Sequence, residues 1–199
     1  SKQIVRLHDF AEALGLKQHH IVGNSMGGHI SALYTQRYPK DVLTLGLFNN
    51  AGIAAPEPSE MESHMLAGGA NPLIVDSAEG FDAMMGWVFE KEPFIPGAVK
   101  RYFADQAIEH REFNIYIFGQ YVEERQGVLE TLLPDIKQPT LVLWGAEDKL
   151  VDVSTVEAMK PLLENETVIV LDGIGHMPML ADVSQTAQDY VAFRRSLTR

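Results

Sequence analysis

The stretch Ile21 to Gly28 reads IVGNSMGG, and the rest of the chain is organised around it. The apolar run HHIVG before Asn24 predicts a strand, and HISALYTQRYP after Gly28 has helical spacing. The pattern G-x-S-x-G at such a junction is typical of a nucleophile elbow, where a serine in strained backbone exposes its Oγ at the strand tip. We expect a side chain at Gly23 or Gly27, which flank Ser25, to collide across the tight turn. The alternative is a glycine-rich turn with an incidental serine, and partners elsewhere in the chain must decide.

Composition limits the classes of function. The 199 residues are 46 % hydrophobic and 22 % charged, which fits one globular domain, or one domain with an insertion. The net charge of −11 argues against nucleic acid or an anionic membrane as the main partner, because both require clustered Lys and Arg. The chain has no cysteine, which excludes disulfides, thiol catalysis and cysteine-ligated metal. No stretch approaches the roughly 20 apolar residues of a membrane span.

Residues 1–50 predict the first part of an α/β core. An amphipathic helix over 1–18, with Gly15 as its stop, precedes the strand 20–24. A helix over 28–38 ends before Pro39, and DVLTLGLFN (41–49) predicts a second, buried strand. In an open doubly wound sheet the serine strand is expected near the middle, yet only one helix precedes it here.

Residues 51–132 predict a helical cap inserted between the two parts of the core. A Pro-rich acidic connection (54–60) leads into four helical patterns without strand alternation, over 60–66, 78–89, 97–110 and 113–123. The segment is rich in methionine and aromatic residues, most of which we expect to serve packing. Their collective excess suits a cap whose underside meets an apolar ligand.

Residues 133–199 again show the alternating strand and helix patterns of an α/β core. TLVLWG (140–145) and ETVIVLDG (166–173) predict strands, and a helix over 153–163, capped by Ser154, joins them. A final helix over 180–197 carries basic residues in its last turns, where the helix dipole favours them. The expected fold class is therefore α/β, with a parallel sheet and a helical cap insertion.

Three loops carry the candidate chemistry, and each follows the carboxyl end of a predicted strand, where an open α/β sheet places its ligands. Ser25 follows the first strand, Asp148 the third and His176 the last. A serine hydroxyl needs an imidazole to take its proton, and the imidazole needs a carboxylate to hold its tautomer. The chain order Ser, acid, His differs from the orders of trypsin-like and subtilisin-like proteases.

The acid of this set has rivals. Glu147 and Asp152 lie in the same loop as Asp148, while Asp135 and Asp172 lie close to strands. Asp148 is favoured because the spacing G-x-x-D puts it just past the end of TLVLWG.

The base also has rivals, because the chain contains seven histidines. His176 lies in a Gly-flanked loop after a strand and is free to turn towards Ser25. We expect structural or solvated roles for His8 on the first helix, for His19 and His20 at the N-terminal end of the serine strand, and for His64 and His110 in the cap. His29 lies one turn into the helix after Ser25, and we expect it to serve helix packing or to face solvent.

The chain resembles the α/β-hydrolase family. GNSMGG, WGAEDKLV and DGIGHMPML stand where that family has its nucleophile elbow, acid loop and histidine loop. GNSMGGHISALY, LFNNAGI, NPLIV, PFIPGAVKRY and LLPDIKQPTLVLWG are most similar to bacterial lipases related to the α/β-hydrolase-domain monoacylglycerol lipases.

This resemblance implies hydrolysis of a carboxylic ester, such as an acylglycerol, with no cofactor and no metal. Ser25 would form an acyl-enzyme, His176 would transfer the proton, and Asp148 would orient His176. The backbone N–H of Met26 would donate to the oxyanion. One alternative is a carbon–carbon hydrolase of ring-fission products on the same fold, although Met177 follows the histidine where those enzymes carry an aromatic residue. Another is a catalytically idle member of the fold used for binding, and the 199 residues alone could also be an inactive fragment of the esterase.

Family members carry about four further strands before the point that corresponds to Ser1, including the loop that supplies the second oxyanion donor. We therefore expect these 199 residues to be part of a longer enzyme. The far edge of the strand His20–Asn24 would then be open, and a preceding segment or an oligomer would cover it.

Overall fold

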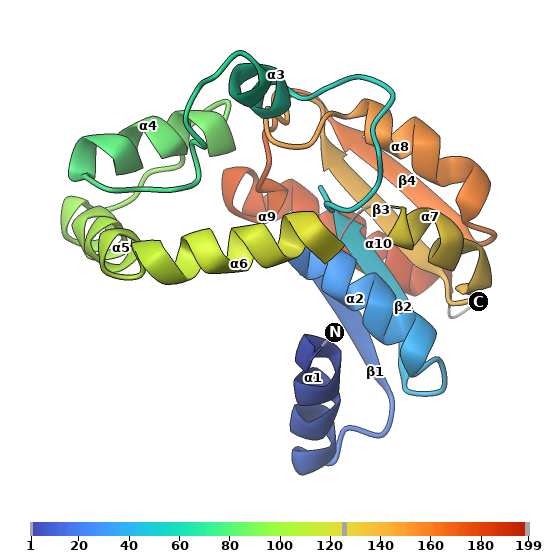
Figure 1. Ribbon diagram of the computed structural model, residues 1–199. Coiled ribbons are helices and arrows are strands. Elements are labelled where there is room, and N and C mark those ends of the chain that lie inside the picture. Colours follow the sequence, from blue (N-terminus) through green and yellow to red (C-terminus); the bar gives the residue numbers. More distant parts are fainter. Residues whose placement is uncertain (1, 125–126, 198–199) are drawn as a thin grey trace.

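A four-stranded parallel sheet forms the centre of the protein in the computed structural model, which describes residues 2–124 and 127–197 (Figure 1). The strand order across these residues is β1-β2-β3-β4. Their bounds are β1 His19–Asn24, β2 Val42–Phe48, β3 Thr140–Gly145 and β4 Glu166–Leu171. Each neighbouring pair is parallel, so all four carboxyl ends lie at one edge of the sheet.

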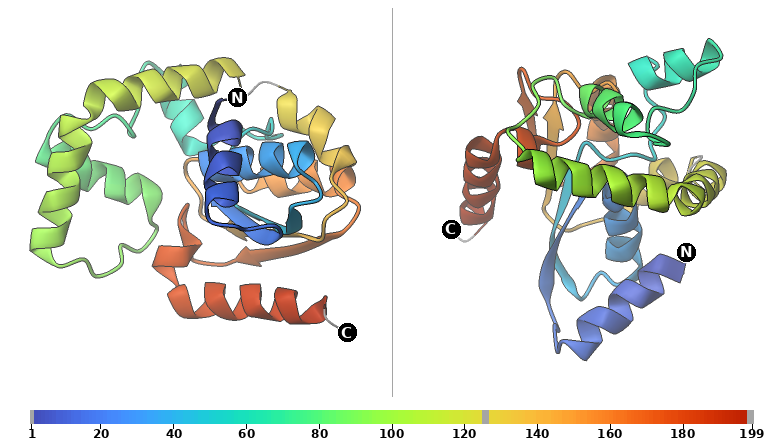
Figure 2. Two further views of the ribbon diagram at one scale, coloured as in Figure 1. Left: turned by 90° about the horizontal axis from the view of Figure 1, so that it is seen from below. Right: turned by 90° about the vertical axis from the view of Figure 1, so that its left-hand side faces the viewer.

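Helices cover both faces of this sheet (Figure 2). The strands follow one another in chain order, so crossovers of one hand place their helices on one face. That face carries α1 Lys2–Ala13, α2 Met26–Arg37, α7 Val128–Leu132 and α8 Ser154–Met159. The chain then turns through α9 Pro178–Ala181, and α10 Val183–Ser196 covers the other face.

Strand β3 shows how the sequence builds the two core layers. All six residues of TLVLWG are buried, as expected for an interior strand covered on both faces. Val142 and Trp144 pack in the layer under α2, α7 and α8. Leu141 and Leu143 point the opposite way and pack with Phe193 of α10, because alternate side chains of a strand point to opposite faces.

Four helices form the cap, which lies over the carboxyl edge of the sheet: α3 Glu60–Leu66, α4 Ala78–Val88, α5 Gly97–Glu109 and α6 Arg111–Glu124. Phe81, Met85 and Phe89 are the large side chains of its own apolar cluster. Leu150 from the loop after β3 belongs to the same cluster, and Met177 packs against it. The cap therefore rests on the loops that carry Asp148 and His176. Helix α7 lies at the end of the segment 51–132 that was predicted as the cap, but it contacts α2 and packs in the sheet core.

The predicted order of strands and helices is confirmed, with differences at the ends of helices. The first helix ends at Ala13, and Gly15, with φ of 69°, lies at the turn after it; Ser1 lies outside the described residues. The predicted helix 153–163 is α8 followed by a 3₁₀ turn, Lys160–Leu162, because the proline there has no N–H to donate. The predicted helix 180–197 is interrupted at Asp182, whose backbone is not helical.

Ser154 does not cap α8, contrary to the prediction. Instead the Asp152 carboxylate accepts a hydrogen bond of 2.8 Å from the Ser154 N–H. A carboxylate placed two residues earlier satisfies a free donor of the first turn and carries favourable charge there.

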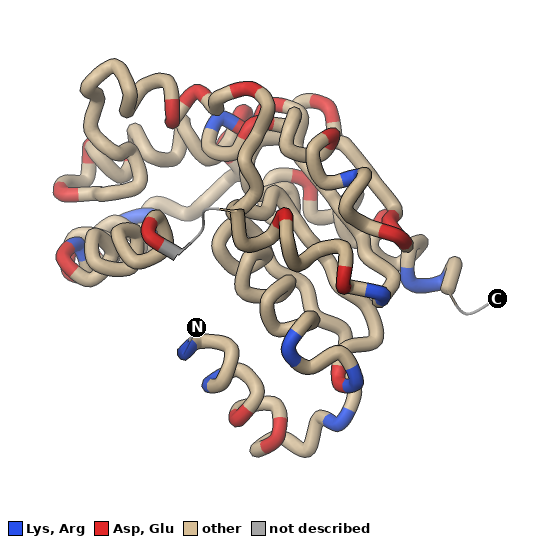
Figure 3. Tube along the Cα trace, turned by 45° about the vertical axis from the view of Figure 1, so that its right-hand side comes forward, with Lys and Arg blue, Asp and Glu red and all other residues tan. Residues whose placement is uncertain are grey.

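The charges are spread over the surface. Figure 3 shows Lys and Arg as short, separate segments in that view, without a continuous basic stripe. Among the described residues, the structure contains no helix both long and apolar enough to cross a bilayer.

Candidate active site

Ser25 lies at the sharp turn between β1 and α2, in the backbone that the sequence motif predicts. Its φ of 55° and ψ of −125° fall in a region that residues with a Cβ rarely adopt. The Ser25 N–H donates to the Phe48 carbonyl at 3.0 Å, and the Ser25 carbonyl accepts from the Ala51 N–H at 3.1 Å. These bonds to β2 and to the loop after it hold the serine in its strained conformation.

The glycines of the elbow contribute unequally. A Cβ on Gly23 would lie 2.1 Å from the Gly27 carbonyl oxygen, so Gly23 is required for strand and helix to meet. The same prediction is wrong for Gly27, where an added Cβ meets nothing within 4 Å. The second crowded position is Gly28, whose Cβ would lie 2.3 Å from that of Asn50. The turn itself leaves Gly27 free, and the packing of α2 against the loop after β2 requires Gly28.

Asp148 and His176 are brought together from two different loops. The His176 Nδ1 lies 2.8 Å from the Asp148 Oδ2, and their side chains are 6 % and 0 % exposed. Because an ionised carboxylate can only accept, Nδ1 carries the proton in this contact. The other ring nitrogen, Nε2, is then free to accept a proton when the ring is neutral.

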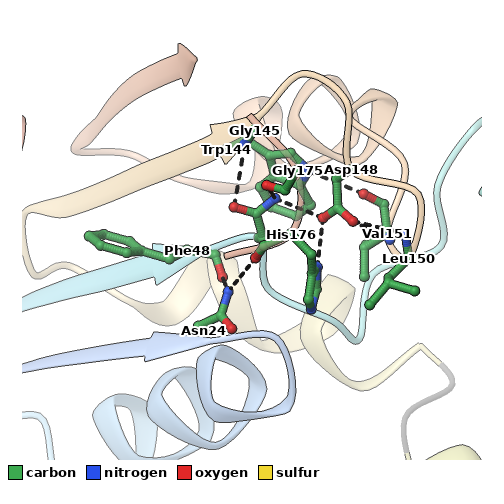
Figure 4. Close-up of polar contacts among 10 residues, drawn as sticks. Asn24, Phe48, Trp144, Gly145, Asp148, Leu150, Val151, Gly175 and His176 are labelled. Carbon is green, nitrogen blue, oxygen red and sulfur yellow. Dashed lines mark hydrogen bonds and ion pairs between the residues drawn. The ribbon is translucent and has the colours of Figure 1, made fainter. Parts of the chain in front are cut away.

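The Asp148 carboxylate is surrounded by donors (Figure 4). Its Oδ1 accepts from the N–H groups of Leu150 at 2.8 Å and Val151 at 3.1 Å. Its Oδ2 accepts from the Asn49 Nδ2 at 2.7 Å, besides the contact with His176. These donors stabilise the ionised form of a carboxylate that water does not reach.

The histidine loop is held through its backbone. The His176 N–H donates to the Val88 carbonyl at the end of α4, at 2.9 Å. The His176 carbonyl accepts from the Asn24 Nδ2 at 2.9 Å, and the same amide donates to the Phe48 carbonyl at 3.0 Å. Asn24, the residue directly before Ser25, thus connects the elbow to the histidine loop.

The rival acids of the same loop have other partners. The Glu147 carboxylate accepts from the Ile174 N–H at 3.0 Å. The Asp152 carboxylate accepts from the Ser154 N–H in the first turn of α8. Both therefore stabilise loop and helix backbone, whereas Asp148 contacts the imidazole.

The other six histidines also have local surroundings of their own. His29 is buried in α2 with its ring edge against Tyr121, at 5.7 Å between centroids. The rest lie beside tyrosines of the α1 and α2 region, beside Thr44, beside Trp87 of the cap, or at the end of α5: His8, His19, His20, His64 and His110.

Ser25 and His176 line one cavity of about 670 Å³ between the cap and the sheet. Met26, at the start of α2, lines it too. The other lining residues come from α3, α6 and the loops and are mostly apolar: Ala51, Pro58, Met61, Glu62, Met65, Leu66, Leu73, Ile74, Asn114, Ile117, Phe118, Tyr121, Val122, Leu150 and Val151. This volume is within the usual range for small-molecule sites, about 300–1,000 Å³.

A metal-binding cluster is not found: no three His, Asp or Glu side chains gather suitably in residues 2–124 and 127–197. The functional candidates that sequence reasoning missed are Asn24 and Asn49, both amides at the carboxyl ends of strands. The polar pair NN directly after the apolar run DVLTLGLF was the available signal.

Residues 3–182 match the family model described as alpha/beta hydrolase fold. Among curated proteins, "Lipase 1" of Psychrobacter immobilis is 38 % identical over 197 residues, which are 98 % of this chain and 62 % of that protein. "Monoacylglycerol lipase ABHD6" of Mus musculus is 30 % identical over 204 residues, covering 98 % of this chain and 61 % of that protein.

A solved structure is also similar over the whole chain. The crystal structure of a membrane phospholipase A, described as a bacterial virulence factor, superposes with a TM-score of 0.95 at 40 % identity. The superposition covers 100 % of this chain and 63 % of that one. The chain thus spans about three fifths of the length of the proteins it matches.

Proposed function

Because the chain belongs to the α/β-hydrolase fold family, we propose that it carries the catalytic residues of a serine hydrolase that cleaves carboxylic esters of lipids. The observation that carries the proposal is a single mostly apolar cavity onto which both Ser25 and the Asp148-paired His176 open. The lipases and the phospholipase among its relatives support an ester as substrate.

In the proposed reaction, His176 Nε2 takes the proton of Ser25 while Oγ attacks the ester carbonyl. The tetrahedral intermediate collapses to an acyl-enzyme, and His176 returns the proton to the departing alcohol. Water then attacks the acyl-enzyme in the same way and frees the acid and Ser25. Asp148 keeps the imidazole in the required tautomer and stabilises the imidazolium that forms in both steps.

The oxyanion needs donors, and we assign one to the backbone N–H of Met26. Met26 is the first residue of α2, where helical N–H groups have no acceptor within their own helix. The positive end of the helix dipole adds to the attraction for a developing negative charge.

The cavity lining favours a substrate with an apolar acyl chain. Its apolar side chains from α3 and α6, among them Met61, Met65 and Phe118, would gain by burying such a chain. A lipid ester therefore fits better than a short, polar one.

The proposal is tested with Ser25→Ala in the full-length protein that carries this chain. A fluorophosphonate should label the wild-type protein covalently, and the alanine variant should lose both labelling and ester hydrolysis. Ser31→Ala, at a buried serine of α2, the helix that follows Ser25, is the control and should retain both. Undiminished turnover by Ser25→Ala would rule out the serine mechanism.

The same assay separates esterase from carbon–carbon hydrolase activity. Activity on p-nitrophenyl esters of increasing chain length is compared with activity on a vinylogous diketone. We expect hydrolysis of the esters, and hydrolysis of the diketone alone would contradict the proposed substrate class.

A further inference from the structure

Asn49 connects three parts of the site, although it lies outside the cavity lining. It is fully buried at the end of β2, with φ of 43°. Its Nδ2 donates to the Asp148 Oδ2 at 2.7 Å and, at 3.5 Å, to the Gly175 carbonyl. Its Oδ1 accepts from the Gly145 N–H at 3.3 Å. One amide thus links β2, the end of β3 and the loop of His176.

We propose that Asn49 is a positioning residue for the reaction, which keeps Asp148 ionised and directs its Oδ2 at His176. The proposal rests on the proposed function, because it assigns the help that the acid of the triad receives. Asn49 touches neither substrate nor reacting atoms and acts through Asp148.

The chemical reason lies in the atom that Asn49 binds. Oδ2 accepts both from Asn49 and from His176. When the imidazole is neutral, Asp148 is a buried net negative charge, and a hydrogen bond to a charged group is worth more than a neutral one. The Asn49 donor therefore stabilises the state in which His176 is ready to accept the proton of Ser25.

The backbone of Asn49 restricts which residues could do this. Its positive φ is tolerated by Asn, Asp and Gly far better than by other residues. Asn is the one among these whose side chain offers both an N–H donor and an oxygen acceptor. Both the donor and the acceptor are used here.

Asn49→Asp isolates the donor, because it keeps the size, the positive φ and the acceptor for Gly145 while replacing N–H by a carboxyl oxygen. Two carboxylates this close in a buried site cannot both stay ionised, so the variant binds an extra proton, either between the two carboxylates or on His176. We expect kcat to fall roughly 10- to 100-fold. The acid limb of the kcat/KM profile should move to higher pH by about one unit. KM should stay unchanged, since Asn49 does not border the cavity.

Two further variants exclude a merely structural effect. In an Asp148→Asn background, adding Asn49→Asp should cause little further loss, because no carboxylate remains to be positioned. Asn71→Asp, in a cap loop where the side-chain oxygen binds the Leu73 N–H at 2.9 Å, makes the same charge change and should leave the profile unchanged.

The outcomes are distinct. If wild-type turnover does not depend on Ser25, the proposed function fails, and the role of Asn49, which rests on it, fails with it. If turnover depends on Ser25 but Asn49→Asp has the wild-type kcat and pH profile, the positioning role is overturned. Should Asn49→Asp not fold, judged by its thermal melt, Asn49→Gly replaces it: lowered kcat with unchanged KM supports the role, and wild-type kcat overturns it.

Discussion

At the scale of single residues, the site depends on which polar atoms meet and not on which residue types are present. Asp148, Glu147 and Asp152 lie within one short loop. Of the hydrogen bonds that these three carboxylates form, the one to His176 comes from Asp148, and the bonds of the other two go to backbone N–H groups. A change to the amide at each of the three therefore separates catalysis from loop structure.

Asp148→Asn should lower kcat by up to about 10⁴, the loss known for a triad whose imidazole is left in the wrong tautomer. Glu147→Gln and Asp152→Asn should retain kcat, because their carboxylates bind backbone N–H groups. The measurement is steady-state hydrolysis of one ester by the three variants. If Asp152→Asn were the most damaging change, the assignment of the acid would be wrong.

Tyr34 gives a residue-scale prediction about stability and pH. Its ring is fully buried in α2, and its hydroxyl has no hydrogen-bond partner within the described residues. Burial, and then the negative charge of Asp41, raise the pKa of Tyr34 above its ordinary value. As the pH rises, the Tyr34 hydroxyl therefore ionises in the unfolded chain before it ionises in the folded protein. The contribution of the protonated hydroxyl to stability is present below about pH 10 and is lost as the pH rises further.

Tyr34→Phe should therefore be as stable as the wild type at pH 7.5 or slightly more stable, by up to about 1 kcal/mol, because a buried unpaired hydroxyl is removed. The advantage in Tm should widen at pH 10.5, where the unfolded wild type ionises. Tyr38→Phe, on the half-buried neighbour that stacks on His8, is the control. A gap between Tyr34→Phe and wild type that stays constant with pH would contradict the prediction.

At the scale of elements, the cap helices are held by their ends as much as by their faces. Helix α3 buries none of its residues, yet it carries a capping box. The Ser59 Oγ accepts from the Glu62 N–H at 3.1 Å, and the Ser59 N–H donates to the Glu62 Oε2 at 3.2 Å. The Met61 N–H also donates to the Lys149 carbonyl of the acid loop at 2.9 Å.

Ser59→Ala should destabilise α3 by about 1 kcal/mol, the typical loss for a cap residue. Because α3 lines the cavity with Met61, Met65 and Leu66, KM for long-chain esters should rise several-fold while kcat on short esters is retained. Ser77→Ala is the control, since Ser77 caps α4 by accepting from the Gly80 N–H at 3.0 Å and borders no part of the cavity. Equal changes of KM in both variants would contradict the role of α3.

At the scale of the whole molecule, β1 occupies one end of the sheet in the described residues. It pairs with β2 alone, and Val22 on this strand is 42 % exposed. An unpaired parallel edge beside apolar side chains tends to pair with another chain. Strand β1 leads directly into the elbow, so a segment that covers this edge would also support Ser25.

We expect the 199 residues on their own to self-associate through the edge at His20–Asn24, or to persist only with another segment bound there. Size-exclusion chromatography with light scattering gives the mass, and hydrogen exchange reports on the amides of β1. A monodisperse monomer with a cooperative melt and protected β1 amides would show that the chain closes its own sheet.

Local patterns determined the order of the elements, because strand and helix periodicities depend on neighbours a few residues apart. IVGNSMGG predicted the strand, the turn and the strained backbone at Ser25, and the strand predicted over 140–145 has the observed bounds. Asp148 and His176 could be proposed because each follows a strand, and the carboxyl ends of parallel strands share one edge.

Only the tertiary structure decided which atoms complete the site. Asn24 binds the His176 carbonyl 152 positions away, and Asn49 binds Asp148 across 99 positions. The structure likewise made Gly28, and not Gly27, the second crowded glycine of the elbow, because the crowding atom belongs to Asn50. Such contacts depend on how loops from separate strands pack against one another. The periodicity of residues along the chain does not indicate which of these loops come into contact.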